Sequence, residues 1–204
     1  MTRGRFITIE GIDGAGKSTQ SMKLEELIAS RGIRVRHTRE PGGTPAGERV
    51  RELLLSSDMG PTAETLLFFA SRAEHVEKLI RPALEAGEWV LSDRFTDATY
   101  AYQVGGKGFP GERVEELERW TLGDFAPDLT ILFDIDPAIA AARLAARAGD
   151  KDRFERMGVD FFTRVREAYL TRARACPERF LIVDAAGSPE DVTAEIAAKV
   201  APWL

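Results

Sequence analysis

The chain has 204 residues, of which 44% are hydrophobic and 30% are charged, and its 28 basic and 33 acidic residues leave a net charge of −5. This composition is ordinary for a globular protein, and the length suffices for one α/β domain, which we predict over residues 1–204. The acidic balance argues against a dedicated nucleic-acid-binding protein, because such proteins are usually basic.

The sequence also argues against export and against a membrane partner. No apolar run approaches the roughly 18 residues that a spanning helix needs. Residues 1–6 lead directly into an apolar strand and leave no room for a signal peptide. The one cysteine, Cys176, cannot form an internal disulfide, and we interpret it as a structural thiol in a reducing compartment. We therefore predict a cytoplasmic protein whose partners include neither a membrane nor a nucleic-acid polymer.

The first predicted strand covers residues 6–10, which form a mostly apolar run. Residues 11–18 follow and read Gly-Ile-Asp-Gly-Ala-Gly-Lys-Ser, a match to G-x-x-x-x-G-K-[ST]. The glycines of this pattern let the backbone turn tightly, so that successive N–H groups face one anion. A helix that begins at Lys17 directs its positive end at the same anion. This stretch therefore predicts a loop that binds the phosphates of a nucleoside triphosphate.

Within this loop, Lys17 is expected to reach the outer phosphates, and the Ser18 hydroxyl is expected to bind Mg²⁺. The predicted ATP-binding residues here are Gly11, Ile12, Asp13, Gly14, Ala15, Gly16, Lys17, Ser18 and Thr19. In the helix that follows, Met22, Leu24, Leu27 and Ile28 form an apolar stripe.

Strand and helix signals alternate along the rest of the chain. Further strands are predicted over residues 33–38, 89–93, 129–134 and 180–184. Helices are predicted over residues 17–31, 44–55, 62–85, 96–124 with a break at 105–111, 137–147 and 156–175, and a last one opens at Ser188-Pro189. Five short strands separated by helices predict an α/β fold with a five-stranded parallel sheet covered on both faces, the three-layer α/β/α arrangement of P-loop NTPases.

Ligands of such sheets bind at the carboxyl ends of the strands. That edge would carry the phosphate loop, Glu40, Asp93 and residues 185–187. Asp93 ends a strand close to the loop, where an acid commonly holds Mg²⁺ directly or through water.

The phosphate loop by itself is shared by ATPases, GTPases and kinases. The N-K-x-D motif of a guanine-specific switch protein is absent, and motor and transport ATPases are usually longer. Arginines are frequent around the candidate loops, at Arg39, Arg51, Arg72, Arg94, Arg143, Arg147 and Arg153. Phosphoryl transfer depends mainly on positioning and charge stabilisation, so this pattern favours direct transfer between two bound nucleotides.

Four further motifs resemble those of the thymidylate kinase family, in order and at family spacing. Residues 38–44 resemble its loop after the second strand, and residues 67–72 resemble its base-binding helix. Residues 93–95, Asp-Arg-Phe, resemble its D-R-[YHF] motif, and residues 152–155 resemble the end of its short lid, here about 148–155. The resemblance covers the whole chain. It implies transfer of the γ-phosphoryl group of ATP to dTMP in dTTP biosynthesis, with Mg²⁺, by a homodimer.

The resemblance also implies how thymine is recognised. Phe68 and Arg72 lie four residues apart and share a helix face. Phe68 would stack on thymine, and Arg72 would donate to a carbonyl of the base. Thr99 would contact the base edge, and Tyr102 would fill the space of a ribose 2′-OH. On periodicity alone, core packing is the alternative for Phe68 and a solvated surface charge is the alternative for Arg72, whereas Tyr102 is better explained as a helix-packing residue.

At the phosphate end, the resemblance implies that Asp13 accepts a hydrogen bond from the sugar 3′-OH. Arg51 and Arg94 would hold the acceptor phosphate, and Arg94 would also bridge to the transferring group. Glu40 would orient either Arg94 or a metal-bound water.

Positions 12–15 of the phosphate loop contain no basic residue. Family members of this kind use basic lid residues instead, so Arg147 or Arg153 would supply the catalytic charge, as Lys17 and Arg94 do from the body of the protein. The spacing leaves open which lid arginine acts, and a merely solvated charge run is the alternative. Arg143 would stack on adenine.

Two other functions stay open at this point. One is the same enzyme class with another acceptor, either a different nucleoside monophosphate or a deoxynucleoside. The other is a nucleotide-dependent binding module without turnover, against which the intact Lys17 and the basic lid both argue.

Overall fold

The computed structural model describes residues 3–146, 153–154 and 156–204. Within these ranges, five strands form one parallel sheet in the order β2-β3-β1-β4-β5. The strands are β1 (Phe6–Gly11), β2 (Val35–Arg39), β3 (Trp89–Asp93), β4 (Leu129–Asp134) and β5 (Phe180–Asp184). The predicted parallel sheet is confirmed, and its carboxyl edge carries the phosphate loop, Glu40, Asp93 and residues 185–187.

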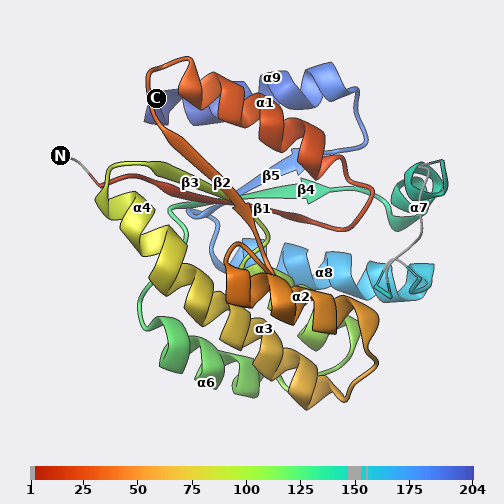
Figure 1. Ribbon diagram of the computed structural model, residues 1–204. Helices are drawn as coiled ribbons and strands as arrows, with labels where there is room; N and C mark the ends of the chain where they lie inside the picture. Colours follow the sequence, from red (N-terminus) through yellow and green to blue (C-terminus); the bar gives the residue numbers. More distant parts are fainter. Residues whose placement is uncertain (1–2, 147–152, 155) are drawn as a thin grey trace.

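Helices cover both faces of this sheet, as Figure 1 shows: α1 and α9 lie on one face, and α2, α3 and α8 lie on the other. The helices are α1 (Lys17–Ala29), α2 (Pro45–Ser56), α3 (Pro61–His75), α4 (Arg81–Glu85), α5 (Thr96–Thr99), α6 (Gly111–Leu122), α7 (Pro137–Ala145), α8 (Val159–Ala175) and α9 (Pro189–Val200). A π-helical segment, η1 (Val76–Ile80), joins α3 to α4, a second, η2 (Tyr100–Gly106), continues α5, and a 3₁₀ turn, η3 (Ala201–Trp203), follows α9. In the part of the chain that the structure describes, no helix combines the length and apolarity that crossing a membrane requires.

The starts of three helices follow the predicted capping chemistry. The side chain of Thr44 accepts a hydrogen bond from the Gly47 amide, Asp136 accepts one from Ala138, and Ser188 accepts one from Asp191. Each of these caps is followed by a proline at the first helical position, where the missing N–H costs no helical hydrogen bond.

The apolar stripe of α1 is narrower than predicted. Leu24 and Ile28 are buried, whereas Met22 is 53% exposed, so Met22 does not share the buried part of the predicted stripe.

The central strand β1 is buried along its whole length, because strands lie on both sides of it and helices cover both of its faces. It ends at Gly11, so the central, fully buried strand of the sheet positions the phosphate loop. The parallel register pairs Ile9 of β1 with Asp93 of β3, which brings the Asp-Arg-Phe motif level with the start of that loop.

A buried ion cluster holds α5 in place beside the sheet. Asp97 of α5 is 1% exposed, and its carboxylate accepts hydrogen bonds from Arg172 Nε at 3.0 Å and from Arg179 Nη1 at 2.6 Å. Burial opposes ionisation, but the hydrogen bonds and charges of Arg179 and Arg172 outweigh it and hold the pKa of Asp97 below its ordinary value. Since α5 leads into η2, this cluster fixes the segment that carries Thr99 and Tyr102.

We predict that Asp97→Asn lowers the free energy of unfolding at neutral pH by about 3 kcal/mol, because it leaves two arginines without their buried counter-charge. The carboxylate's contribution is present above its unfolded pKa and is lost as the pH falls through its lowered folded pKa. The difference between the two proteins should therefore shrink below about pH 4. Urea titration at several pH values measures it. Glu195→Gln, which removes one partner of an exposed pair with Lys199 on α9, is the control and should cost less than about 1 kcal/mol. Equal losses for the two variants would contradict the prediction.

Candidate active site

The phosphate loop joins β1 to α1, and its backbone requires glycine. Gly11, Gly14 and Gly16 have φ values of 134°, 89° and 84°. A Cβ at Gly11 would lie 2.6 Å from the Phe133 carbonyl oxygen, and one at Gly14 would lie 2.4 Å from the Ala140 carbonyl oxygen. A side chain at either position would therefore displace the loop from the sheet edge or from α7.

Lys17 lies over this loop. Its Nζ donates to the carbonyl oxygens of Gly11 at 3.0 Å and Ile12 at 2.9 Å, and it lies 3.7 Å from Asp13 Oδ1. Burial lowers the pKa of Lys17, and the nearby Arg94 lowers it further. Ser18 and Thr19 are exposed at the start of α1, where an anion would meet the positive end of the helix.

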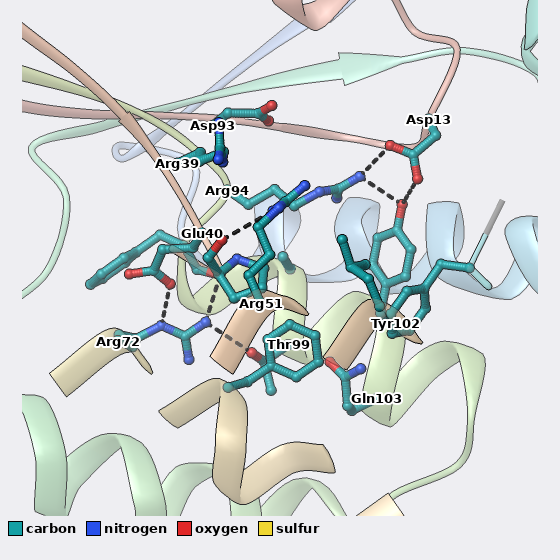
Figure 2. A pocket seen from close by; sticks show the side chains of 16 residues that line it. Asp13, Arg39, Glu40, Arg51, Arg72, Asp93, Arg94, Thr99, Tyr102 and Gln103 are labelled. Atoms are coloured by element: carbon teal, nitrogen blue, oxygen red, sulfur yellow. Dashed lines mark hydrogen bonds and ion pairs between the residues drawn. The ribbon is translucent and has the colours of Figure 1, made fainter. Parts of the chain in front are cut away.

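Arg94 connects the phosphate loop to the rest of the site. Its Nη2 donates to Asp13 Oδ1 at 2.7 Å and to Tyr102 Oη at 2.9 Å (Figure 2). Its Nη1 donates to the Gly11 carbonyl at 3.2 Å and to Tyr169 Oη at 3.1 Å. The guanidinium thus joins the turn after β3 to the loop after β1.

The charges of this cluster compensate one another. Burial would raise the pKa of Asp13, but Arg94 and then Lys17 lower it to about 2, so the carboxylate is ionised at neutral pH. Burial likewise opposes the charge of Arg94, yet Asp13 holds the pKa of that guanidinium well above its ordinary value. Tyr102 Oη donates to Asp13 Oδ2 at 3.1 Å and completes the cluster.

A cavity extends from this cluster between α3 and α5, and it contains every predicted acceptor residue. It is lined by Asp13, Arg39, Glu40, Pro41, Arg51, Leu55, Phe68, Arg72, Asp93, Arg94, Phe95, Ala98, Thr99, Tyr102, Gln103 and Phe154. Arg39, Gln103 and Phe154 are the additions that matter chemically. Phe154 forms an aromatic corner with Phe68 and Tyr102, with ring centroids 6.3 Å and 6.1 Å away.

Arg72 lies at the other end of the cavity and is 1% exposed. Its Nε donates to Glu40 Oε2 at 2.7 Å, and its Nη2 donates to Thr99 Oγ1 at 3.0 Å (Figure 2). Its Nη1 is buried and has no hydrogen-bond partner among the described residues. A buried donor without an acceptor is costly, so this end of the cavity suits a ligand that offers an acceptor such as a carbonyl oxygen.

Glu40 does not orient Arg94, and that interpretation was wrong. Its carboxylate pairs with Arg72, and Oε1 lies 3.1 Å from His75 Nδ1, so both oxygens face α3. The reason is that the loop after β2 turns toward α3, whereas Arg94 follows β3 and turns toward the phosphate loop. A metal-bound water as a further partner of Glu40 remains a prediction.

Arg51 also lines the cavity, and its Nη1 donates to the Pro41 carbonyl at 3.0 Å. Burial and the neighbouring charge of Arg39 lower the pKa of Arg51. Two like charges this close, with Arg94 also in the cavity wall, make a corner that attracts an anion.

Two of the predicted residues could hold Mg²⁺. Asp93 Oδ1 is buried and has no hydrogen-bond partner among the described residues, and the Ser18 hydroxyl is exposed at the phosphate loop. An unpartnered carboxylate oxygen and a hydroxyl are oxygen ligands of the kind that Mg²⁺ uses together with substrate phosphates. The donor set therefore fits the ion.

The lid is described only in part. Arg147, Lys151 and most of residues 148–155 lie outside the described residues. Arg153 forms an ion pair with Glu64 of α3, and its guanidinium lies 4.6 Å from the Phe154 ring centroid. Arg143 donates to the Ala185 carbonyl at 2.8 Å, next to a second cavity lined in part by Gly16 and Thr19.

Sequence reasoning missed four buried polar residues around the site: Glu10, Glu64, His75 and Tyr169. Glu10 carried one signal, since it is an acid inside an apolar strand directly before the phosphate loop. The other three lie on helices at positions that fit packing, and nothing local distinguishes them.

Comparison with known proteins agrees with the motifs. The thymidylate kinase family profile matches residues 9–196. A thymidylate kinase from Methylobacillus flagellatus is 53% identical over 194 residues, 95% of each chain, and one from Paraburkholderia xenovorans is 55% identical over 192 residues, 92% of this chain and 93% of that one. The crystal structure of thymidylate kinase from Ehrlichia chaffeensis has a TM-score of 0.78 and 34% identity, over 97% of this chain and 99% of that chain. The chain therefore belongs to the thymidylate kinase family.

Proposed function

We propose that the protein transfers the γ-phosphoryl group of ATP to dTMP, forming dTDP and ADP, in dTTP biosynthesis and with Mg²⁺. One observation carries the proposal: a single cavity runs from the Asp13–Arg94 pair at the phosphate loop to the buried Arg72 donor. A triphosphate on the loop and a nucleotide in the cavity would thus meet at Arg94.

The two ends of the cavity suit the two ends of dTMP. Phe68 and Phe154 supply an apolar aromatic wall, and Arg72 and Thr99 supply polar contacts, which together fit a pyrimidine. Arg51 and Arg94 supply positive charge at the opposite end, which fits a phosphate. Tyr102 lies between these ends beside Asp13, where we place the sugar, its 3′-OH donating to Asp13 and the ring of Tyr102 excluding a 2′-OH.

The transfer itself requires little covalent chemistry from the protein. An oxygen of the acceptor phosphate forms a bond to the γ-phosphorus, and the bond from that phosphorus to the β–γ bridging oxygen breaks. Arg94, Arg51 and Lys17 hold the reacting oxygens in line and stabilise their charge, and a lid arginine, Arg147 or Arg153, adds to this charge. Mg²⁺ held by Ser18 and Asp93 would neutralise charge on the β- and γ-phosphates.

A cytoplasmic location, a single domain over residues 1–204 and stacking of Arg143 on adenine remain predictions.

We also propose that the protein is a homodimer. The groove between α3 and α6 is lined by Leu66 and Trp120, which are 48% and 81% exposed, and such a surface suits a second copy of the chain.

We predict that dTMP is the best acceptor in a panel with dUMP, dCMP, dGMP, dAMP, UMP and thymidine. Formation of ADP from ATP is followed with Mg²⁺ and again with EDTA, which should abolish turnover. The preference over dUMP should be modest, since one methyl group is worth about 1–3 kcal/mol in an apolar pocket. UMP should be a poorer acceptor than dUMP if Tyr102 excludes the 2′-OH.

The inactive control is Lys17→Ala, which should fold normally and lose turnover. An equal rate with several monophosphates would contradict the dTMP assignment. ATP binding without turnover on any acceptor would favour the binding module.

We predict that Arg72→Ala raises KM for dTMP by roughly 10- to 100-fold and leaves KM for ATP within about twofold, because only the base loses a charged donor. The matched control is Arg81→Ala on α4, which removes another arginine that lies over a phenylalanine ring but lines no part of this cavity. Steady-state kinetics measures both KM values for each variant, at equal protein concentration and after thermal melting has shown that each variant is folded. Equal increases in KM for dTMP and ATP would contradict the assigned base contact.

We predict that light scattering gives a mass of about twice 22.5 kDa. Trp120→Glu should lower it toward one chain, because a charge in an apolar interface is costly. A monomeric parent protein would contradict the dimer.

A further inference from the structure

Glu10 is the penultimate residue of β1 and is completely buried, although it is an acid. Glu10 does not line the cavity and is not part of the phosphate loop, so the proposed reaction gives it no contact with either nucleotide. Its two oxygens have different partners. Oε1 accepts a hydrogen bond from the Phe95 amide at 2.7 Å, and Oε2 lies 2.7 Å from Tyr169 Oη.

The first of these contacts fixes the backbone around Arg94. Arg94 has a φ of 72°, and among the described residues it is the one non-glycine residue with a positive φ. An L-residue in this conformation costs about 1 kcal/mol or more, so the surrounding structure must hold it. The Arg94 amide donates to the Ile9 carbonyl at 3.0 Å, and Ser92 Oγ donates to the Arg94 carbonyl at 2.8 Å. Glu10 holds the next amide along the chain and so completes the turn.

The second contact reaches the side chain of the same arginine. Tyr169 lies on α8 and is 1% exposed. Its hydroxyl accepts a hydrogen bond from Arg94 Nη1 at 3.1 Å and is also hydrogen-bonded to Glu10 Oε2. One buried acid therefore supports Arg94 indirectly from two sides: through the Phe95 amide, which follows Arg94 in the chain, and through Tyr169, which binds its guanidinium.

Glu10 can make both hydrogen bonds without replacing Asp13 as the ionic partner of Arg94. Burial, and then the nearby Asp97, raise the pKa of Glu10 to about 8, so it is mostly neutral at neutral pH. Whether Glu10 is neutral or ionised, a hydrogen bond joins its Oε2 to Tyr169 Oη at 2.7 Å. Asp13 is thus left as the ionic partner of Arg94.

We propose that Glu10 and Tyr169 are positioning residues for Arg94, which together fix its strained turn and its guanidinium before any nucleotide binds. This inference rests on the proposed function in one respect, namely that Arg94 holds the acceptor phosphate and the transferring group. Neither residue touches a reacting atom.

The test is Tyr169→Phe, which removes one hydroxyl and keeps the ring that packs in the core. The matched control is Tyr100→Phe. Tyr100 also donates to a glutamate, Glu118, at 2.7 Å, but it makes no contact with Arg94. Tyr169→Phe should lower kcat and raise KM for dTMP, so that kcat/KM falls about tenfold, while KM for ATP stays within about twofold, an effect of the size of one lost hydrogen bond. Tyr100→Phe should change none of these. A loss of folded protein alone would lower kcat and leave both KM values unchanged.

A double-mutant cycle with Arg94→Ala shows whether Tyr169 acts through Arg94. In the Arg94→Ala background, Tyr169→Phe should change kcat/KM for dTMP by less than about twofold. The same tenfold loss there, or no loss in the parent background, would overturn the proposal.

Glu10→Leu removes both contacts and risks the fold, so Glu10→Gln is made beside it. Glutamine keeps an acceptor for the Phe95 amide and a polar group for Tyr169, and it should retain most of the activity that leucine loses. Equal activity of the two variants would overturn the role of Glu10.

The proposal can fail separately from the proposed function. If the parent protein prefers another acceptor, the same cycle is run with that acceptor. If it shows no turnover at all, crystal structures of the parent and of Tyr169→Phe decide. Displacement of the Arg94 guanidinium from Asp13 in the variant supports the proposal, and an unmoved guanidinium overturns it.

Discussion

The ion pair between Asp13 and Arg94 is the contact on which the rest of the site depends. It joins the loop after β1 to the turn after β3, two neighbouring strands, at the edge of the sheet where ligands bind. A free carboxylate beside bound phosphates would repel them. Paired with a guanidinium that stays cationic, the carboxylate becomes a fixed hydrogen-bond acceptor at little electrostatic cost.

At the opposite end of the cavity, a second arginine, Arg72, is buried and also has a carboxylate partner. Arg72 is paired with the buried Glu40, which His75 also contacts, so its charge is compensated within the protein. What remains is the buried Nη1 group, which has no acceptor among the described residues and is a directional donor. Arg51, by contrast, donates to a backbone carbonyl and forms no ion pair within 4 Å among the described residues, so its charge is better placed to attract an anion. The Arg72 end of the cavity therefore offers a directional donor, which suits the proposed base site, and the Arg51 end offers positive charge, which suits the proposed phosphate site.

The sequence was sufficient for features that depend on neighbouring residues. Strand positions, three proline-marked helix starts and the phosphate loop all have short-range patterns, and each was predicted. Partners that meet across long separations were not predictable in this way. Glu40 and Arg72 are 32 residues apart, and Arg94 and Tyr169 are 75 residues apart, so only the packing of helices on the sheet brings them together. The arginines could be singled out by their motifs, but the choice of their partners could not.

Helix packing also links Tyr102, beside which we place the sugar, to Arg94, which we propose holds the acceptor phosphate. Tyr102 lies on η2, which approaches α8 so closely that a Cβ at Gly106 would lie 2.5 Å from the Phe161 ring. Helix α8 also carries Tyr169, and both tyrosine hydroxyls accept hydrogen bonds from Arg94. The positions of Tyr102 and Tyr169 relative to Arg94 thus depend on the packing of η2 against α8. A shift of α8 relative to η2 would move Tyr169 Oη away from Tyr102 Oη, so the Arg94 guanidinium would lose one of its two tyrosine contacts while keeping Asp13.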